Sequence, residues 1–137
     1  MARTLLIDES LDKRLATELA ARGRPSQSHA QLGTTGRVDE VVLQRLAQLE
    51  FDWVLVTADD AMPLEHATRI RNMGATIATI DGAAMEKWRK RGVLTQEEFK
   101  SETVHRWAHK MAEQTVGTIR RYSPNTNLGW TPPRKRP

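Results

Sequence analysis

Two short apolar runs, each followed by carboxylates, constrain the fold of this 137-residue chain more than any other feature. The first run occupies residues 4–7 and is followed by Asp8-Glu9; the second occupies residues 53–57, and Asp59-Asp60 come after it. Apolar runs of this length are typical of strands buried on both faces of a parallel sheet. Ligands bind at the carboxyl edge of such sheets, so acids delivered there can converge on one metal ion or cationic substrate.

The segments between and after these runs alternate between helical and extended patterns. The patterns predict helices over residues 11–22, 38–50 and 63–73, a weak strand within 24–30 and a strand over 75–80. Ser10 is the expected cap of the first helix, and Gly23 and Gly74 are expected to end helices. This alternation predicts an α/β fold with a parallel sheet of about four strands and helices on both faces.

The carboxyl-terminal part is expected to be helical and then irregular. A capping box, Thr95 to Glu98, predicts a helix that continues to about Arg121, with Trp88 and Trp107 in the core. Residues 123–137 carry four of the six prolines and are expected to be largely exposed. The length suits one core, so we expect a single domain over 1–122 with a C-terminal helical extension, followed by a basic, proline-rich tail over 123–137.

Composition limits the chemistry and the location. The chain has no cysteine, and its four histidines show no metal-ligand spacing, so the expected ligands of any metal are oxygens. No apolar stretch is long enough to span a bilayer, and acids follow the amino terminus too soon for a secretory signal. We therefore expect a cytoplasmic protein without a membrane partner.

The net charge of +4 is unevenly distributed along the chain. All 17 acidic residues lie at or before Glu113, whereas Arg120, Arg121 and the basic run at 134–136 come after it. This basic end favours a polyanion such as RNA or an acidic partner protein, although a solvated end is an equally good interpretation. Trp130 is too apolar for a free end, and we expect it to dock on this chain, on a second copy in a homo-oligomer, or on a partner.

The candidate site residues are the acids expected at the carboxyl edge of the sheet. Asp8, Asp39 and Asp59 are the candidate catalytic acids and, with Asp60, the candidate metal ligands. Such a cluster repels itself unless a hard cation such as Mg²⁺ or Mn²⁺ occupies it, and the cation can promote hydrolysis of a phosphodiester. Supporting candidates are Glu9, Glu40, the Thr57 hydroxyl and Arg37 as a phosphate contact. Acids in the first turn of a helix, such as Asp39 and Glu40, are also explained by the helix dipole alone.

The motifs that contain these acids resemble those of compact PIN-like domains related to VapC-type toxins. Residues 5–11 read Leu-Leu-Ile-Asp-Glu-Ser-Leu, residues 38–42 Val-Asp-Glu-Val-Val and residues 54–59 Val-Leu-Val-Thr-Ala-Asp. The family patterns are roughly Leu-Leu-Asp-Glu-Asn-Leu, Asp-Glu-Glu-Ile and Val-Thr-Asn-Asp-x-Asp. The resemblance covers residues 4 to 85. Ala61 stands where the family usually has a second acid, with Asp60 beside it, and Ser10 replaces the usual Asn.

The resemblance implies a three-layer α/β/α sandwich and a Mg²⁺-dependent endoribonuclease, commonly the toxin of a type II toxin-antitoxin pair. It further implies RNA as substrate, an antitoxin as partner, and Asp8, Asp39 and Asp59 as the acids of the metal site. One alternative is a non-catalytic RNA- or protein-binding domain of the same kind. Another is a phosphoacceptor receiver domain, which would need a lysine at the end of a fifth strand; the sequence after Asp81 predicts helix and no such strand.

Overall fold

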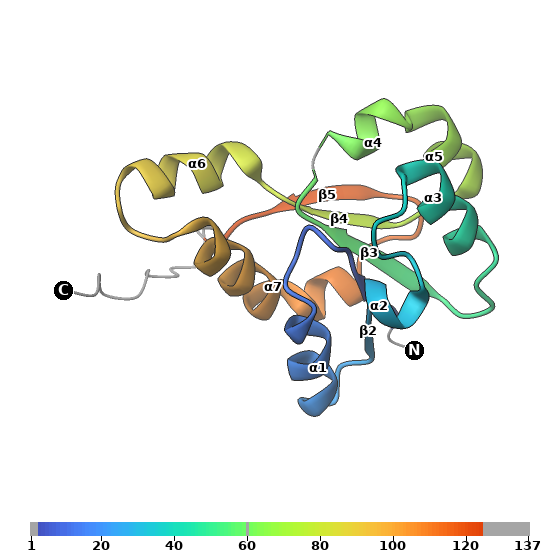
Figure 1. Ribbon diagram of the computed structural model, residues 1–137, viewed down its shortest axis with the longest axis horizontal. Helices are drawn as coiled ribbons and strands as arrows, with labels where there is room; N and C mark the ends of the chain where they lie inside the picture. Colours follow the sequence, from blue (N-terminus) through green and yellow to red (C-terminus); the bar gives the residue numbers. More distant parts are fainter. Residues whose placement is uncertain (1–2, 60, 125–137) are drawn as a thin grey trace.

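Five parallel strands form one sheet at the centre of the molecule (Figure 1). The computed structural model describes residues 3–59 and 61–124. The strand order is β2-β1-β3-β4-β5, and every neighbouring pair is parallel. The strands are β1 Thr4–Ile7, β2 Ser26–Ser28, β3 Trp53–Thr57, β4 Ile77–Ile80 and β5 Ile119–Tyr122. The predicted parallel sheet is confirmed, with five strands in place of about four.

Helices cover both faces of this sheet (Figure 1). They are α1 Arg14–Ala21, α2 His29–Leu32, α3 Asp39–Ala47, α4 Met62–Glu65, α5 Ala67–Met73, α6 Gly82–Lys90 and α7 Gln96–Ala112. Helices α1, α6 and α7 lie on one face, and α2 to α5 lie on the other. The architecture is therefore α/β with one all-parallel sheet, compatible with the predicted α/β/α layering.

The core is divided by the sheet into two apolar clusters. In β1, Leu5 and Ile7 pack toward α1 and α7, whereas Leu6 packs toward α3 and α5. Successive side chains of a strand point to opposite faces, so a continuous apolar run suits a strand that is covered twice. All three residues are fully buried, which confirms the interpretation of the first apolar run. Trp88 and Trp107 are buried in the same cluster as Leu5 and Ile7, as expected.

The expectation of one helix from residue 95 to about Arg121 is wrong. The capping box at Thr95 and Glu98 is present, but α7 ends at Ala112, and residues 119–122 form the edge strand β5. The apolar contacts of α7 end at Met111 and Ala112, and Gly117 then adopts a positive φ of 80° that reverses the chain. Charged side chains on β5 suit a strand at the edge of a sheet.

Two further helix boundaries differ from the sequence interpretation. Helix α1 begins at Arg14, and its N-cap Lys13 makes no capping bond with its side chain, so Ser10 is not its cap. Residues 62–73 form two helices separated at His66, and Gly74 ends the second with a left-handed conformation, as expected. Ser10 and His66 instead contribute to the edge of the sheet where the acids lie.

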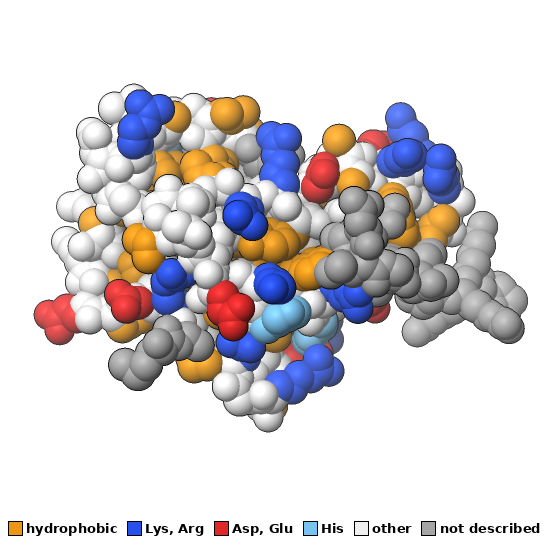
Figure 2. Space-filling model, turned by 180° about the vertical axis from the view of Figure 1, so that it is seen from behind, with side chains coloured by type: hydrophobic (Ala, Val, Ile, Leu, Met, Phe, Trp, Pro, Cys, Tyr) orange, Lys and Arg blue, Asp and Glu red, His pale blue; other side chains and the backbone are white. Residues whose placement is uncertain are grey.

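The surface carries its charges unevenly. On the face shown in Figure 2, Lys and Arg side chains are more frequent than carboxylates and are scattered among exposed hydrophobic side chains.

Within the described residues, no helix has the length and apolar character needed to cross a membrane. Almost all of the tail expected over 123–137 lies outside the described residues, and so does Trp130.

Candidate metal centre

Neighbouring strands β1 and β3 end together at one edge of the sheet. Ile7 lies beside Val56 in the parallel register, and the backbone N–H of Asp8 donates to the carbonyl of Val56 at 3.0 Å. Asp8 therefore extends β1 by one residue and lies close to Thr57. The first two acidic segments predicted from sequence are brought to the same edge, as expected for parallel strands.

Two hydroxyl groups orient the carboxylate of Asp8. The Thr57 hydroxyl donates to Oδ2 of Asp8 at 2.9 Å, and the Ser10 hydroxyl donates to the same oxygen at 2.8 Å. Thr57 is fully buried, and its oxygen also accepts the N–H of Asp59 at 3.0 Å. The Ser10 oxygen accepts the N–H of Ala58 at 2.9 Å. These bonds tie the ends of β1 and β3 together and fix one oxygen of Asp8.

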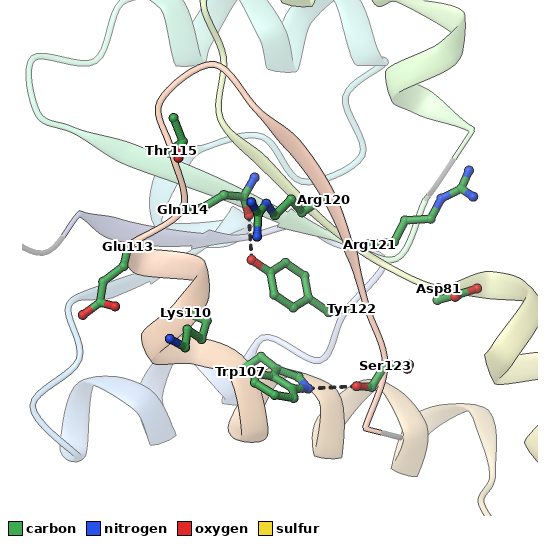
Figure 3. Close-up of a pocket in the computed structure, with 10 residues that line it drawn as sticks. All are labelled: Asp81, Trp107, Lys110, Glu113, Gln114, Thr115, Arg120, Arg121, Tyr122 and Ser123. Carbon is green, nitrogen blue, oxygen red and sulfur yellow. Dashed lines mark hydrogen bonds between the residues drawn. The ribbon is translucent and has the colours of Figure 1, made fainter. Parts of the chain in front are cut away.

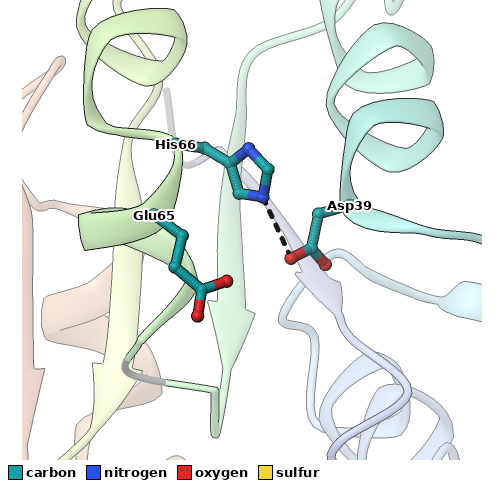
Figure 4. A group of neighbouring side chains, drawn as sticks. All are labelled: Asp39, Glu65 and His66. Carbon is teal, nitrogen blue, oxygen red and sulfur yellow. Dashed lines mark hydrogen bonds and ion pairs between the residues drawn. The ribbon is translucent and has the colours of Figure 1, made fainter.

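A second group of side chains forms where α3 begins and α4 gives way to α5. Asp39 is the first residue of α3, Glu65 is the last of α4, and His66 lies between α4 and α5. The Nε2 atom of His66 lies 3.2 Å from Oδ2 of Asp39 (Figure 4). One potential ligand atom from each of the three residues lies within 4.8 Å of the other two. Asp39 and His66 are part-buried, whereas Glu65 is exposed.

The donor set of Asp39, Glu65 and His66 fits a divalent cation. Ligand atoms bound to one ion at 2.0 to 2.1 Å can lie at most roughly 4.2 Å apart, so only a small rotation of flexible side chains closes the group around an ion. Carboxylate oxygens suit Mg²⁺ and Mn²⁺, and an imidazole nitrogen adds a preference for transition metals. The imidazole departs from the oxygen-only site expected from composition.

The same three residues also have contacts that need no metal. His66 and Asp39 can hold one another by a hydrogen bond that becomes an ion pair when the imidazole is protonated. Asp39 and Glu40 lie in the first turn of α3, where the helix dipole stabilises acids. The closeness of these side chains is therefore also explained without a metal ion.

The other predicted site residues make contacts that position the chain. Asp59 is exposed, and its Oδ1 accepts the N–H groups of Ala61 at 3.2 Å and Met62 at 3.1 Å, where α4 begins. Glu9 accepts the N–H of Gly36 at 2.8 Å and thereby holds the loop that leads to α3. Among the described residues, Asp8 and Asp59 do not belong to a group of three ligands as close as that around Asp39.

Four more of the predicted residues are exposed, and a fifth lies outside the described residues. Arg37 is exposed in the loop before α3, and Glu40 is exposed in the first turn of that helix. Arg120 and Arg121 are exposed on β5, away from the acids of the metal centre. Asp60 lies outside the described residues, so its part in the site stays a prediction.

Sequence reasoning missed Glu65, His66 and Lys100. The Nζ atom of Lys100, on α7, donates to the carbonyl of Ser10 at 3.1 Å and lies 3.3 Å from Oε1 of Glu97. It brings a positive charge to the end of β1. No short spacing relates Lys100 to Ser10 or His66 to Asp39, because these pairs come from segments that meet only in the folded chain. The break between α4 and α5 was the only local signal that could have marked His66.

The fifth strand changes the argument against a receiver domain. The expectation that no strand follows Asp81 is wrong, because β5 pairs with β4 over Ile119 to Tyr122. The strand reads Ile-Arg-Arg-Tyr and is followed by Ser123 and Pro124, so a lysine is absent from this end of the described chain. The receiver interpretation therefore still lacks the residue it needs.

Comparisons of this chain with protein-family models, with curated proteins and with solved structures find no match.

Proposed function

We propose that this protein is a metal-dependent endoribonuclease that hydrolyses phosphodiester bonds at the carboxyl edge of its sheet. The observation that carries the proposal is the convergence of Asp39, Glu65 and His66 within 4.8 Å at the amino end of α3. The fixed carboxylate of Asp8 at the ends of β1 and β3 supplies a further acid at this edge. RNA as the substrate class rests on the resemblance to PIN-like domains.

Each residue group has a distinct part in this proposal. Asp39, Glu65 and His66 would hold Mg²⁺ or Mn²⁺, with the imidazole favouring Mn²⁺ of the two. A bound divalent cation supplies charge neutralisation at a phosphate and lowers the pKa of water. Asp8, oriented by Ser10 and Thr57, would accept a hydrogen bond or proton from an attacking water. Lys100 offers a cation for the phosphate backbone at the same edge.

The biological role proposed with this activity is that of a toxin held inactive by a cognate antitoxin. Its support is the order and spacing of the motifs at Asp8, Asp39 and Asp59. The exposed apolar side chains Val38, next to Asp39, and Leu64, next to Glu65, flank the metal ligands in sequence and offer apolar contact area to a partner protein. A small protein that co-purifies with the chain and blocks its RNA cleavage would support this role.

The activity is tested with purified full-length protein, single-stranded RNA and either Mn²⁺, Mg²⁺ or excess chelator. Cleavage is expected with Mn²⁺ or Mg²⁺ and should disappear in chelator. Asp39→Asn and His66→Gln should each lower the rate at least about tenfold, since each removes a ligand. Glu50→Gln, an exposed change outside the site, is the matched control. Cleavage that persists in chelator contradicts the metal mechanism, and absence of cleavage by metal-loaded protein favours a non-catalytic binding domain.

A further inference from the structure

A cavity of about 510 Å³ lies between α7 and the edge strand β5 (Figure 3). Its lining includes Trp107 and Lys110 from α7, Gln114 from the following turn, and Arg120 and Tyr122 from β5. Residues Asp39, Glu65 and His66 do not line it, so it is separate from the candidate metal centre. Its volume is in the range of small-ligand and cofactor pockets.

The wall of this cavity is fixed by buried hydrogen bonds. Gln114 is only 4% exposed, and its Nε2 donates to the carbonyls of Ile77 at 2.8 Å and Thr118 at 2.9 Å. The Tyr122 hydroxyl donates to Oε1 of Gln114 at 2.9 Å, so the phenol ring is held in the wall of the cavity (Figure 3). Trp107 is held in turn by a bond from Nε1 to the carbonyl of Ser123 at 2.8 Å. The aromatic surface is thus formed before any ligand arrives.

Three cations and two carboxylates line the cavity, so its lining has a formal net charge of +1. Lys110, Arg120 and Arg121 all line it and are exposed, and none of them forms an ion pair with an acid in the described part of the chain. Two carboxylates, those of Asp81 and Glu113, also line the cavity. The Asp81 carboxylate accepts the N–H of Ala84 at 3.1 Å as the cap of α6. An anionic group between Lys110 and Arg120 would therefore gain charge-assisted hydrogen bonds without breaking an ion pair.

We propose that this cavity binds a nucleotide, with its phosphate on Lys110 and Arg120 and its base against the ring of Tyr122. Arg120 and Tyr122 are two residues apart along β5, so their side chains lie on the same face of the strand, toward α7. Cations beside an aromatic ring form the usual binding surface for a phosphate that carries a base. The nucleotide is either a free one or one residue of a single-stranded RNA. This proposal requires neither the metal centre nor RNA cleavage.

The test measures the affinity of full-length protein for 5′-AMP and for a single-stranded RNA octamer by calorimetry at low salt, with chelator present to prevent cleavage. The Lys110→Gln, Arg120→Gln double variant should bind at least about tenfold more weakly, because two charged hydrogen bonds are lost. For RNA, its salt slope should fall by about 0.7, since Lys110 and Arg120 contact one phosphate and that contact is lost. Tyr122→Leu should weaken binding roughly tenfold through lost stacking, whereas Tyr122→Phe, which keeps the ring, should retain most of the affinity.

Arg91→Gln, an exposed change at the end of α6 that removes one positive charge outside the cavity, is the control and should leave both affinities unchanged. Binding of both ligands, weakened only by the cavity variants, supports the proposal; binding of AMP alone assigns a free nucleotide, and binding of the octamer alone assigns an RNA strand. The proposal is overturned if neither ligand binds or if the cavity variants match Arg91→Gln. A glutamate-rich peptide that binds the cavity when neither nucleotide ligand does would also overturn it and would indicate an acidic protein partner.

Discussion

The hydroxyl group of Thr57 donates to Oδ2 of Asp8 at 2.9 Å and so joins the last residue of β3 to the residue after β1. Because Thr57 is fully buried, water does not compete for its hydroxyl, whereas the Asp8 carboxylate is part-buried. The same oxygen of Thr57 accepts the N–H of Asp59. One buried hydroxyl therefore sets both the orientation of Asp8 and the path of the chain beyond β3.

Replacing Thr57 by Val should destabilise the fold by about 2 kcal/mol, because the N–H of Asp59 and the Asp8 carboxylate each lose a partner. Thr103→Val is the matched control. Thr103 is equally buried, but its hydroxyl donates only to the carbonyl of Phe99 one helical turn earlier in α7, which already serves the helix. Its replacement should cost less than about 1 kcal/mol. Urea unfolding of the two variants measures the difference, and equal losses would mean that the Thr57 hydroxyl has no special role.

His66→Gln should weaken Mn²⁺ binding at least about tenfold, since the imidazole is the one nitrogen ligand of the candidate metal centre. Saturating Mn²⁺ at 100 times the dissociation constant should stabilise the unmodified protein by about 2.7 kcal/mol, and the variant by less at the same concentration. His109→Gln, an exposed change on α7, is the control. Calorimetric titration and the shift in melting temperature provide the two readouts. Equal Mn²⁺ affinity in both variants would remove His66 from the metal site.

Much of the central fold follows from local patterns in the sequence. The buried strands β1 and β3 were predicted because their apolar runs leave no polar face, and α7 begins where its capping box predicts. These strands make apolar contacts on both faces of the sheet, so an uninterrupted apolar run is enough to predict them. Strand β5 was missed because its residues Arg120 and Arg121 are exposed at the edge of the sheet and leave no such run.

The candidate site was predictable only in part, because its contacts join distant segments. The sequence places Asp8 and Thr57 at strand ends, and the parallel register brings them together. The contact between Asp39 and His66 depends instead on how α3 packs beside the break between α4 and α5. Asp59 as a metal ligand stays a prediction. Its carboxylate accepts the N–H groups of Ala61 and Met62, so Asp59→Ala should cost roughly 1 kcal/mol even without metal.

Gln114→Leu should destabilise the fold by about 2 kcal/mol or more, because the buried amide forms hydrogen bonds with Ile77 in β4, with Thr118 just before β5 and with the Tyr122 hydroxyl in β5. Leucine fills similar space but leaves the carbonyls of Ile77 and Thr118 without this donor. Gln44→Leu, an exposed change on α3, should change stability by less than about 0.5 kcal/mol. Chemical denaturation of both variants measures their losses in the free energy of unfolding. A small loss for Gln114→Leu would show that β5 is held mainly by its backbone pairing with β4.

Tyr122 is the only tyrosine in the chain, so its ionisation can be followed by ultraviolet absorbance without interference from other phenols. Burial raises the pKa of its phenol above the ordinary value of 10.0, and the nearby Arg120 guanidinium offsets part of that rise. Because the folded state holds this proton more tightly than the unfolded chain, the contribution to stability is fully present below pH 10 and is lost as pH rises through the higher, folded pKa.

Arg120→Gln should therefore raise the titration midpoint of Tyr122 further, since it removes the cation that favours the phenolate. Arg91→Gln should leave the midpoint unchanged, and protein unfolded in denaturant should titrate near pH 10. The measurement is an absorbance titration of folded protein from pH 8 upward, paired with the melting temperature over the same range. A midpoint at or below that of the unfolded chain, or no response to Arg120→Gln, would mean that the ring of Tyr122 is solvated and does not form the wall of the cavity beside β5.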